Sequence, residues 1–170
     1  GLLNRNIADA VSLPSCQRHQ WQTLNELDIN RFLEAAKQTP YHVLFYEALF
    51  TGMRRSELLA LRWCDVDLLL CQVHVTRSLH HLRTGETVIR APKTAKGRRM
   101  VALSPSATLL LQEHKDKQAA QHVTLRIPVT DNDLIFSDHL GKPLLGNTVT
   151  HAWVKLVKRI GLKGVRFHDA

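Results

Sequence analysis

The sequence has little cysteine and no long apolar run. Its three cysteines, Cys16, Cys64 and Cys71, form no Cys-x-x-Cys pair, and their odd number favours free thiols in a reducing compartment. The spacing of Cys64, Cys71 and His74 matches no common zinc pattern, so we expect no metal site. No apolar stretch is long enough to cross a bilayer and no signal-peptide pattern opens the sequence, which predicts a cytosolic protein that does not bind a membrane.

Two further chemistries lack their usual signals. The sequence has no glycine-rich Walker loop to cradle phosphates, and no pair of carboxylates at the spacing of a two-metal centre. Internal repeats and low-complexity segments are also missing. We therefore expect no cofactor.

Positive charge is what the sequence has in excess. Lysine and arginine number 23 against 15 acidic residues, a net charge of +8, and the sequence pI is about 9.8. This balance favours a polyanionic partner. A length of 170 residues with 44% apolar content suits one globular domain that buries roughly two-thirds of its unfolded surface.

The segment Thr51–Asp67 combines a helix end with a charged pair. The almost wholly apolar run Tyr41–Phe50 predicts a buried helix, which Gly52 ends in the left-handed conformation that glycine adopts cheaply. Arg54 then falls in the first turn of a new helix, with Glu57 three residues later on the same face. An arginine held in this way can offer a planar fork of donors to a phosphate. A surface ion pair on an amphipathic helix is the alternative.

Turn and cap signals divide the rest of the chain. Residues 1–20 contain short apolar pieces broken by polar residues, which predicts a linker or the tail of a preceding domain. The capping box Thr23–Glu26 opens an amphipathic helix, Ser104 precedes another, and Asn147 is expected to cap the last one. Between these helices lie three short β-prone runs, Cys71–Leu79, Glu86–Ala91 and Arg99–Leu103, which predict a small antiparallel sheet.

A basic loop joins the second and third of these runs. Its cations lie on a projecting tip, where they can reach a groove of a nucleic acid. A solvated hairpin that blunts a sheet edge is the alternative. The cations are Lys93, Lys96, Arg98 and Arg99.

The sequence closes with the segment Val165–Ala170, which contains His168. The elements follow one another in a definite order: an Arg-x-x-Glu helix, three strands with a lysine in the second turn, further helices and then this histidine. This order resembles the catalytic domain of tyrosine recombinases, the phage-integrase family of DNA strand-exchange enzymes. The resemblance covers about residue 20 to the end. It implies an α+β, mainly α-helical fold with a small three-stranded antiparallel sheet.

The resemblance implies roles for the residues that match its motifs. Arg54 matches the first active-site arginine, which holds the non-bridging oxygens of the scissile phosphate, and Glu57 matches the acidic residue that supports it. Lys93 matches the general acid for the departing 5′-oxygen, with Lys96 as the alternative if the loop register differs. His168 matches an acid/base and phosphate-binding histidine; outside this context it would be a capping or surface residue. The remaining cations of these segments are expected to bind DNA: Arg55, Lys96, Arg98 and Arg99.

The family pattern continues past Ala170. Its second arginine would follow His168 by three positions, and its nucleophilic tyrosine would come later still. Tyr41 and Tyr46 precede Arg54 in the predicted buried helix, where we expect them to pack and not to attack. Residues 21–170 are therefore expected to be a C-terminally truncated catalytic domain, inactive by itself, after a linker or core-binding tail at 1–20.

For the intact parent, the resemblance implies a phenolate that attacks a DNA phosphodiester and forms a 3′-phosphotyrosyl intermediate, without metal or ATP. Its partners would be double-stranded DNA and other protomers, in a tetramer on DNA, and the protein, bacterial or phage-encoded, would be cytoplasmic. Arg54, Lys93 and His168 should then converge on one basic concave face. Two alternatives stay open: a non-catalytic DNA-binding module of the same fold, and an unrelated basic helical adaptor for protein or RNA.

Overall fold

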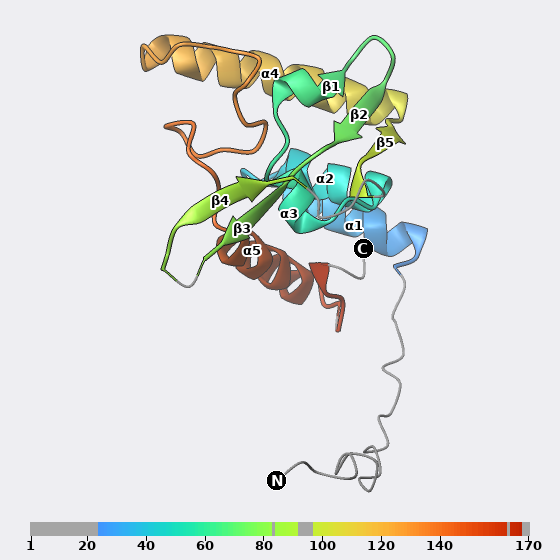
Figure 1. The fold of residues 1–170 in the computed structure, drawn as a ribbon. Helices are drawn as coiled ribbons and strands as arrows, with labels where there is room; N and C mark the ends of the chain where they lie inside the picture. The colour runs from blue at the N-terminus through green and yellow to red at the C-terminus, as the bar shows by residue number, and fades with distance from the viewer. Residues whose placement is uncertain (1–23, 83, 92–96, 163, 168–170) are drawn as a thin grey trace, which may run out of the picture.

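A computed structural model describes residues 24–82, 84–91, 97–162 and 164–167. Figure 1 shows α4 at one end of the molecule beside β1, β2 and β5, and α5 at the other end beside the β3–β4 hairpin, with the first three helices between them. Among the helices of the described residues, none has both the length and the apolar character needed to span a bilayer. The helices are α1 (Glu26–Ala36), α2 (His42–Thr51), α3 (Arg55–Leu58), α4 (Pro105–Thr124) and α5 (Gly146–Arg159), with a short 3₁₀ turn, η2, at Trp63–Asp65.

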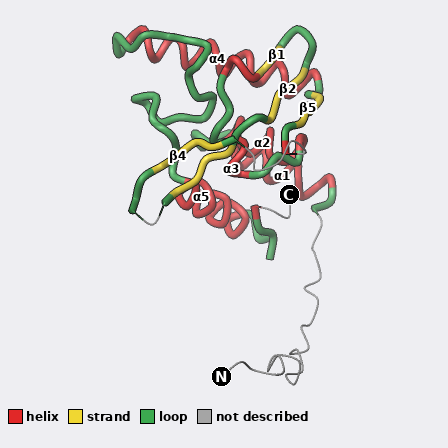
Figure 2. Tube along the Cα trace, in the orientation of Figure 1, coloured by secondary structure: helices red, strands yellow, loops and turns green. Residues whose placement is uncertain are grey.

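The strands form two small antiparallel sheets, and Figure 2 shows the strands as yellow stretches of the tube. One sheet has three strands in the order β1-β2-β5, and the other is the hairpin β3-β4. The strands are β1 (Val66–Asp67), β2 (Gln72–Val75), β3 (Ser78–His81), β4 (Thr87–Arg90) and β5 (Arg99–Ala102). The predicted mainly helical α+β fold with a small antiparallel sheet is confirmed.

The predicted membership of that sheet was wrong, because its third strand is β1, which was not predicted, and the run Glu86–Ala91 supplies β4 of the separate hairpin. The run Cys71–Leu79 is not one strand, because it divides into β2, which pairs with β1 and β5, and β3, which pairs with β4. At the division, Arg77 donates to Oδ1 of the buried Asp65 over 2.6 Å, and Thr76 donates to the same oxygen over 3.4 Å. The chain passes from one sheet to the other where Thr76 and Arg77 are bound to Asp65 of η2, a contact that local propensity does not predict.

Two predicted helix starts were also displaced. Asn25, and not Thr23, is the N-cap of α1, because its Oδ1 accepts the backbone N–H of Asp28 over 2.8 Å. Helix α5 begins at Gly146, one residue before the predicted cap Asn147. The partner of its first backbone N–H is remote in the sequence, since Gly146 N donates to Nε2 of His81 on β3 over 3.1 Å.

Trp153 is the centre of the aromatic core. It is fully buried on α5, and its ring centroid lies 4.3 Å from Phe32 on α1, 5.3 Å from Phe45 on α2 and 5.1 Å from Phe167. Its indole N–H donates to the carbonyl of Val165 over 3.2 Å. Buried aromatic pairs of this kind each add about 0.5–1.5 kcal/mol beyond the area they bury, so the core fixes the segment 164–167 against three helices.

Glu47 is an exception within this core. It lies on α2 with 1% of its surface exposed, and in the described part of the chain neither carboxyl oxygen has a hydrogen-bond partner. Burial raises the pKa of Glu47 to about 8, because the charged form loses its hydration. The side chain is therefore a neutral acid in the folded protein at pH 7.

Glu47 should make the folded protein less stable as the pH rises. The carboxyl ionises near its ordinary pKa of 4.5 in the unfolded chain and near 8 in the folded one, so between these values the folded state binds more protons. Its contribution to stability is complete below pH 4.5 and is lost as the pH approaches 8, by up to about 1.4 kcal/mol per pH unit. Chemical denaturation at pH 5 and pH 8 should show this slope in the wild type and a flatter one in Glu47→Gln. The exposed Glu113→Gln should keep the wild-type slope; equal slopes in all three proteins would contradict the prediction.

Gly52 ends α2 as predicted. Its φ is +60°, in the left-handed region, and its N–H donates to the carbonyl of Ala48 over 3.2 Å. Thr51 contributes a second closure, because its hydroxyl donates to the carbonyl of Glu47 and accepts the N–H of Met53 over 3.3 Å. The turn fixes where the chain leaves α2 and therefore where α3 begins.

Replacing Gly52 with alanine should lower the free energy of unfolding by about 1 kcal/mol, because a Cβ disfavours the left-handed conformation. Gly52→Asn should lose less, since asparagine tolerates this region better than other side chains. No atom lies within 4 Å of a Cβ placed at Gly52, so backbone strain and not collision is being measured. Thermal unfolding of the three proteins checks the order Gly, Asn, Ala; an alanine variant as stable as the wild type would refute it.

Candidate active site

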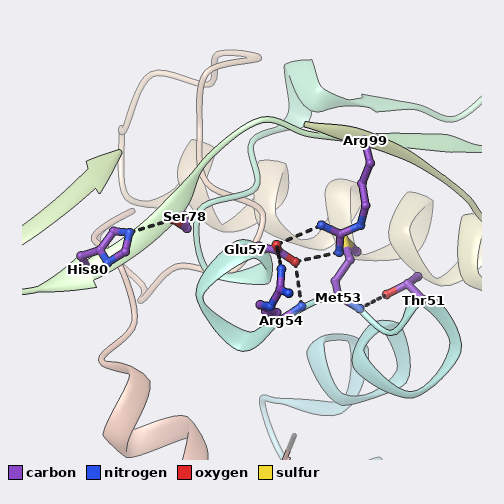
Figure 3. A network of polar contacts seen from close by, with 7 residues as sticks. All are labelled: Thr51, Met53, Arg54, Glu57, Ser78, His80 and Arg99. Atoms are coloured by element: carbon purple, nitrogen blue, oxygen red, sulfur yellow. Dashed lines mark hydrogen bonds and ion pairs between the residues drawn. The ribbon is translucent and has the colours of Figure 1, made fainter. Parts of the chain in front are cut away.

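A buried carboxylate organises the site. Glu57 lies on α3 with 6% of its surface exposed, and Figure 3 shows two arginines converging on it. Arg99, the first residue of β5, donates from Nη1 to Oε1 over 3.0 Å and from Nη2 to Oε2 over 2.8 Å. This is the paired, parallel geometry in which an arginine binds a carboxylate most strongly.

Arg54 is the second partner of Glu57. Its backbone N–H donates to Oε2 over 2.8 Å, and its side-chain Nη1 donates to Oε1 over 3.1 Å. Arg54 occupies the N-cap position of α3, one residue before the first turn in which it was predicted. Its side chain is 72% exposed, whereas that of Glu57 is 8% exposed. The guanidinium is thus held at one edge by a buried acid while its other donors face solvent.

The protonation of Glu57 follows from these contacts. Burial by itself would raise its pKa, but the hydrogen bonds from Arg99 and from the backbone and side chain of Arg54 outweigh burial and lower the pKa below its ordinary value. The hydrogen bond to Glu57 likewise raises the pKa of Arg99. Two cations and one anion leave the cluster with an excess positive charge beside the exposed face of Arg54.

Arg55, predicted to bind DNA, has an internal partner in the structure. Its guanidinium donates to the hydroxyl of Thr150 on α5. It also lies against Gly146, where an added Cβ would come within 3.2 Å of Nε. Arg55 therefore packs α3 against α5, and its contact with DNA stays a prediction.

Of the predicted loop cations, Arg98 is exposed and Arg99 is bound to Glu57. Lys93, Lys96 and His168 lie outside the described residues, so their convergence with Arg54 stays a prediction. The residue before His168 is described: Phe167 is buried against Phe45 and Trp153, with ring centroids 6.1 Å and 5.1 Å apart.

The two tyrosines pack as predicted. The ring of Tyr41 lies 5.8 Å from that of Phe45, and the ring of Tyr46 lies 4.5 Å from that of Phe50. Both are partly buried against the core of the α2 region. Over residues 24–82, 84–91, 97–162 and 164–167, no three histidine, cysteine, aspartate or glutamate side chains gather as metal ligands would.

Sequence reasoning missed the role of Arg99. It treated Arg99 as one more cation of a basic loop, because nothing local distinguishes it from its neighbour Arg98. Its partner Glu57 lies 42 positions earlier. Only the antiparallel pairing that places the start of β5 near α3 brings the two together.

Comparison with known proteins agrees with the family resemblance that the sequence motifs indicated. The model of the phage integrase family matches residues 22–170. A tyrosine recombinase XerC-like protein of Caldanaerobacter subterraneus subsp. tengcongensis is 25% identical over 86% of this chain and 40% of its own length. An integrase of Streptomyces ambofaciens is 29% identical over 92% of this chain and 41% of its own length. The chain thus spans less than half of the length of these curated relatives.

Solved structures share the fold. The Tn1549 transposon integrase in complex with transposon right end DNA superposes with a TM-score of 0.75 and 18% identity, covering 98% of this chain and 55% of that one. The XerA recombinase gives a TM-score of 0.66 and 23% identity, covering 90% of this chain and 48% of that one. Because the family match extends over most of the sequence and includes the Arg54–Glu57 pair, the chain belongs to the phage integrase family.

Proposed function

We propose that this chain is part of the catalytic domain of a site-specific DNA recombinase, which breaks and rejoins DNA through a 3′-phosphotyrosyl intermediate. The observation that supports this most directly is the exposed guanidinium of Arg54, which is held by a buried, ionised Glu57. The family membership excludes the unrelated adaptor considered from the sequence. Since the chain spans 40% to 46% of its curated relatives, the reaction belongs to the longer protein.

The chemistry of Arg54 suits a phosphodiester. A planar guanidinium offers paired donors to the non-bridging oxygens of a phosphate, whose negative charge increases as the attacking oxygen bonds to phosphorus. Because Glu57 fixes Arg54 through both its backbone and its side chain, the donors are oriented before DNA arrives. Preorganised donors of this kind stabilise the transition state without moving during the reaction.

The other assignments complete the proposal. Lys93, with Lys96 as its alternative, would protonate the departing 5′-oxygen, and His168 would bind the phosphate and transfer protons. Fixed cations then neutralise the developing charge, and the reaction needs no metal or ATP. The attacking tyrosine would come from a part of the protein outside this sequence.

We propose double-stranded DNA and further protomers as partners. The Tn1549 integrase is solved with transposon right end DNA, and a lambda integrase tetramer is solved bound to a Holliday junction. Both share the fold of this chain, and its charge of +8 suits the same polyanion. Substrate and relatives together favour the bacterial cytoplasm as its location.

Loss of Arg54 should impair the chemical step far more than DNA binding. In the full gene product, Arg54→Ala should slow covalent adduct formation on a nicked substrate by about 10²- to 10³-fold, because one preorganised donor is removed from the transition state. Affinity for intact DNA should fall only slightly. Denaturing gels of single-turnover reactions measure the adduct, and Lys117→Ala on the exposed surface of α4 is the control. An adduct formed at the wild-type rate would refute the role of Arg54, whereas a wild type that binds DNA and forms no adduct would favour the non-catalytic module.

The basic loop should contribute the salt dependence of DNA binding. Each phosphate contact releases counterions, so removing Lys96 and Arg98 together should reduce the slope of log affinity against log salt by about 1.8, at about 0.9 for each contact. The charge-matched control is Lys117→Ala with Lys142→Ala, on α4 and in the segment that follows it. Fluorescence anisotropy at several salt concentrations measures the slopes. An equal loss in both double variants would show that net charge, and not the loop, determines binding.

A further inference from the structure

From its position next to the basic loop, Arg99 would be expected to contact DNA, yet its side-chain donors are directed inward to Glu57. It follows the basic segment that contains Lys93, Lys96 and Arg98, and all four were predicted to face DNA. In the structure both of its terminal nitrogens bind the two oxygens of Glu57, at 3.0 and 2.8 Å. Its side chain is 34% exposed, about half of the exposure of Arg54.

The four hydrogen bonds at Glu57 are shared evenly between its oxygens. Oε1 accepts from the side chains of Arg54 and Arg99, and Oε2 accepts from the backbone of Arg54 and the side chain of Arg99. The two parallel bonds from Arg99 fix the plane of the carboxylate. That plane determines where the single side-chain bond to Arg54 points.

Arg99 also changes the net charge of the cluster that it forms with Glu57 and Arg54. A lone Glu57 would neutralise Arg54, and a neutral pair attracts a phosphate weakly. With Arg99 present, two guanidiniums share one carboxylate, so a net positive charge remains at the exposed side of the cluster. Removing Arg99 would also leave a buried carboxylate with one cationic partner, which favours protonation of Glu57 and weakens its bond to Arg54.

We propose that Arg99 is a positioning residue for Arg54: it holds the Glu57 carboxylate in the orientation that presents the Arg54 guanidinium to the scissile phosphate, and it keeps the cluster cationic. This inference rests on the proposed recombinase function. Arg99 also begins β5, so the same pair ties the strand that follows Lys93 and Lys96 in sequence to α3.

The chain offers a matched control. Arg77 also lies next to a strand and also binds a buried carboxylate, since its Nη2 donates to Oδ1 of Asp65 over 2.6 Å with the side chain 25% exposed. No described contact joins Arg77 or Asp65 to Glu57 or Arg54. Arg77→Met and Arg99→Met therefore each remove an arginine that binds a buried carboxylate, and only the second of these arginines supports Arg54.

Single-turnover cleavage by the full gene product tests the proposal. At saturating DNA, Arg99→Met should slow adduct formation by roughly 10- to 100-fold, the order of loss expected when a reacting group is misplaced. Its DNA affinity and salt slope should stay close to those of the wild type, and Arg77→Met should cleave at nearly the wild-type rate. The acid side of the pH–rate profile should move to higher pH in Arg99→Met only, and Arg99→Lys, which keeps the charge without the fork, should recover part of the rate.

Two results would overturn the proposal. A salt slope reduced by about 0.9 with unchanged cleavage at saturating DNA would make Arg99 a phosphate contact. Equal losses of cleavage in Arg99→Met and Arg77→Met, with unmoved pH profiles, would leave it a purely structural residue.

A measurement on the 170-residue chain separates this inference from the proposed function. Carboxyl NMR of Glu57 and Nε–Hε NMR of Arg54 should show, in Arg99→Met, a Glu57 titration moved to higher pH and an Arg54 signal that follows it. Arg99→Lys provides the same readout if the methionine variant does not fold. Unchanged signals would refute the positioning role even if the wild-type gene product recombines DNA, while moved signals in a protein that forms no adduct would reject the recombinase function alone.

Discussion

The site depends on one constraint, the burial of an ionised carboxylate. An unpaired anion at the position of Glu57 would cost several kcal/mol, so the surrounding chain has to supply donors to both oxygens. The start of α3 supplies the backbone N–H and the guanidinium of Arg54, and the start of β5 supplies the guanidinium of Arg99. Glu47 shows the other outcome for a buried acid, since in the described residues no donor reaches it and it stays protonated.

Several arginines make hydrogen bonds within the protein. Arg31 of α1 donates to the carbonyl of Ile160 at the end of α5. Arg159 of α5 donates to the carbonyl of Ala35 at the end of α1, so each of these helices supplies an arginine to the C-terminal end of the other. Further arginines bind partners in other elements: Arg55 to Thr150, Arg77 to Asp65 and Arg99 to Glu57. The net charge of +8 therefore overstates the number of cations whose donors are left for an external anion. Arginine suits both tasks, because its fork can satisfy two acceptors in fixed geometry.

Local patterns in the sequence predicted those features that depend on neighbouring residues. The apolar run before Gly52 predicted α2 and its left-handed end, and the spacing of Arg54 and Glu57 placed the two side chains on one face. The family motifs gave the mainly helical fold with a small antiparallel sheet. Each of these depends on backbone periodicity, on the conformational freedom of glycine or on a contact between residues three positions apart.

The tertiary structure decided the contacts between residues that are far apart in the sequence. The division of the run Cys71–Leu79 into two strands follows from the ties of Thr76 and Arg77 to Asp65, and the start of α5 at Gly146 follows from His81, 65 positions away. The partner of Arg99 is likewise absent from any local pattern. By itself the sequence determined which residues could bind a phosphate; the folded chain decided which arginine faces outward and which is bound to the buried acid, because strand pairing and burial set those distances.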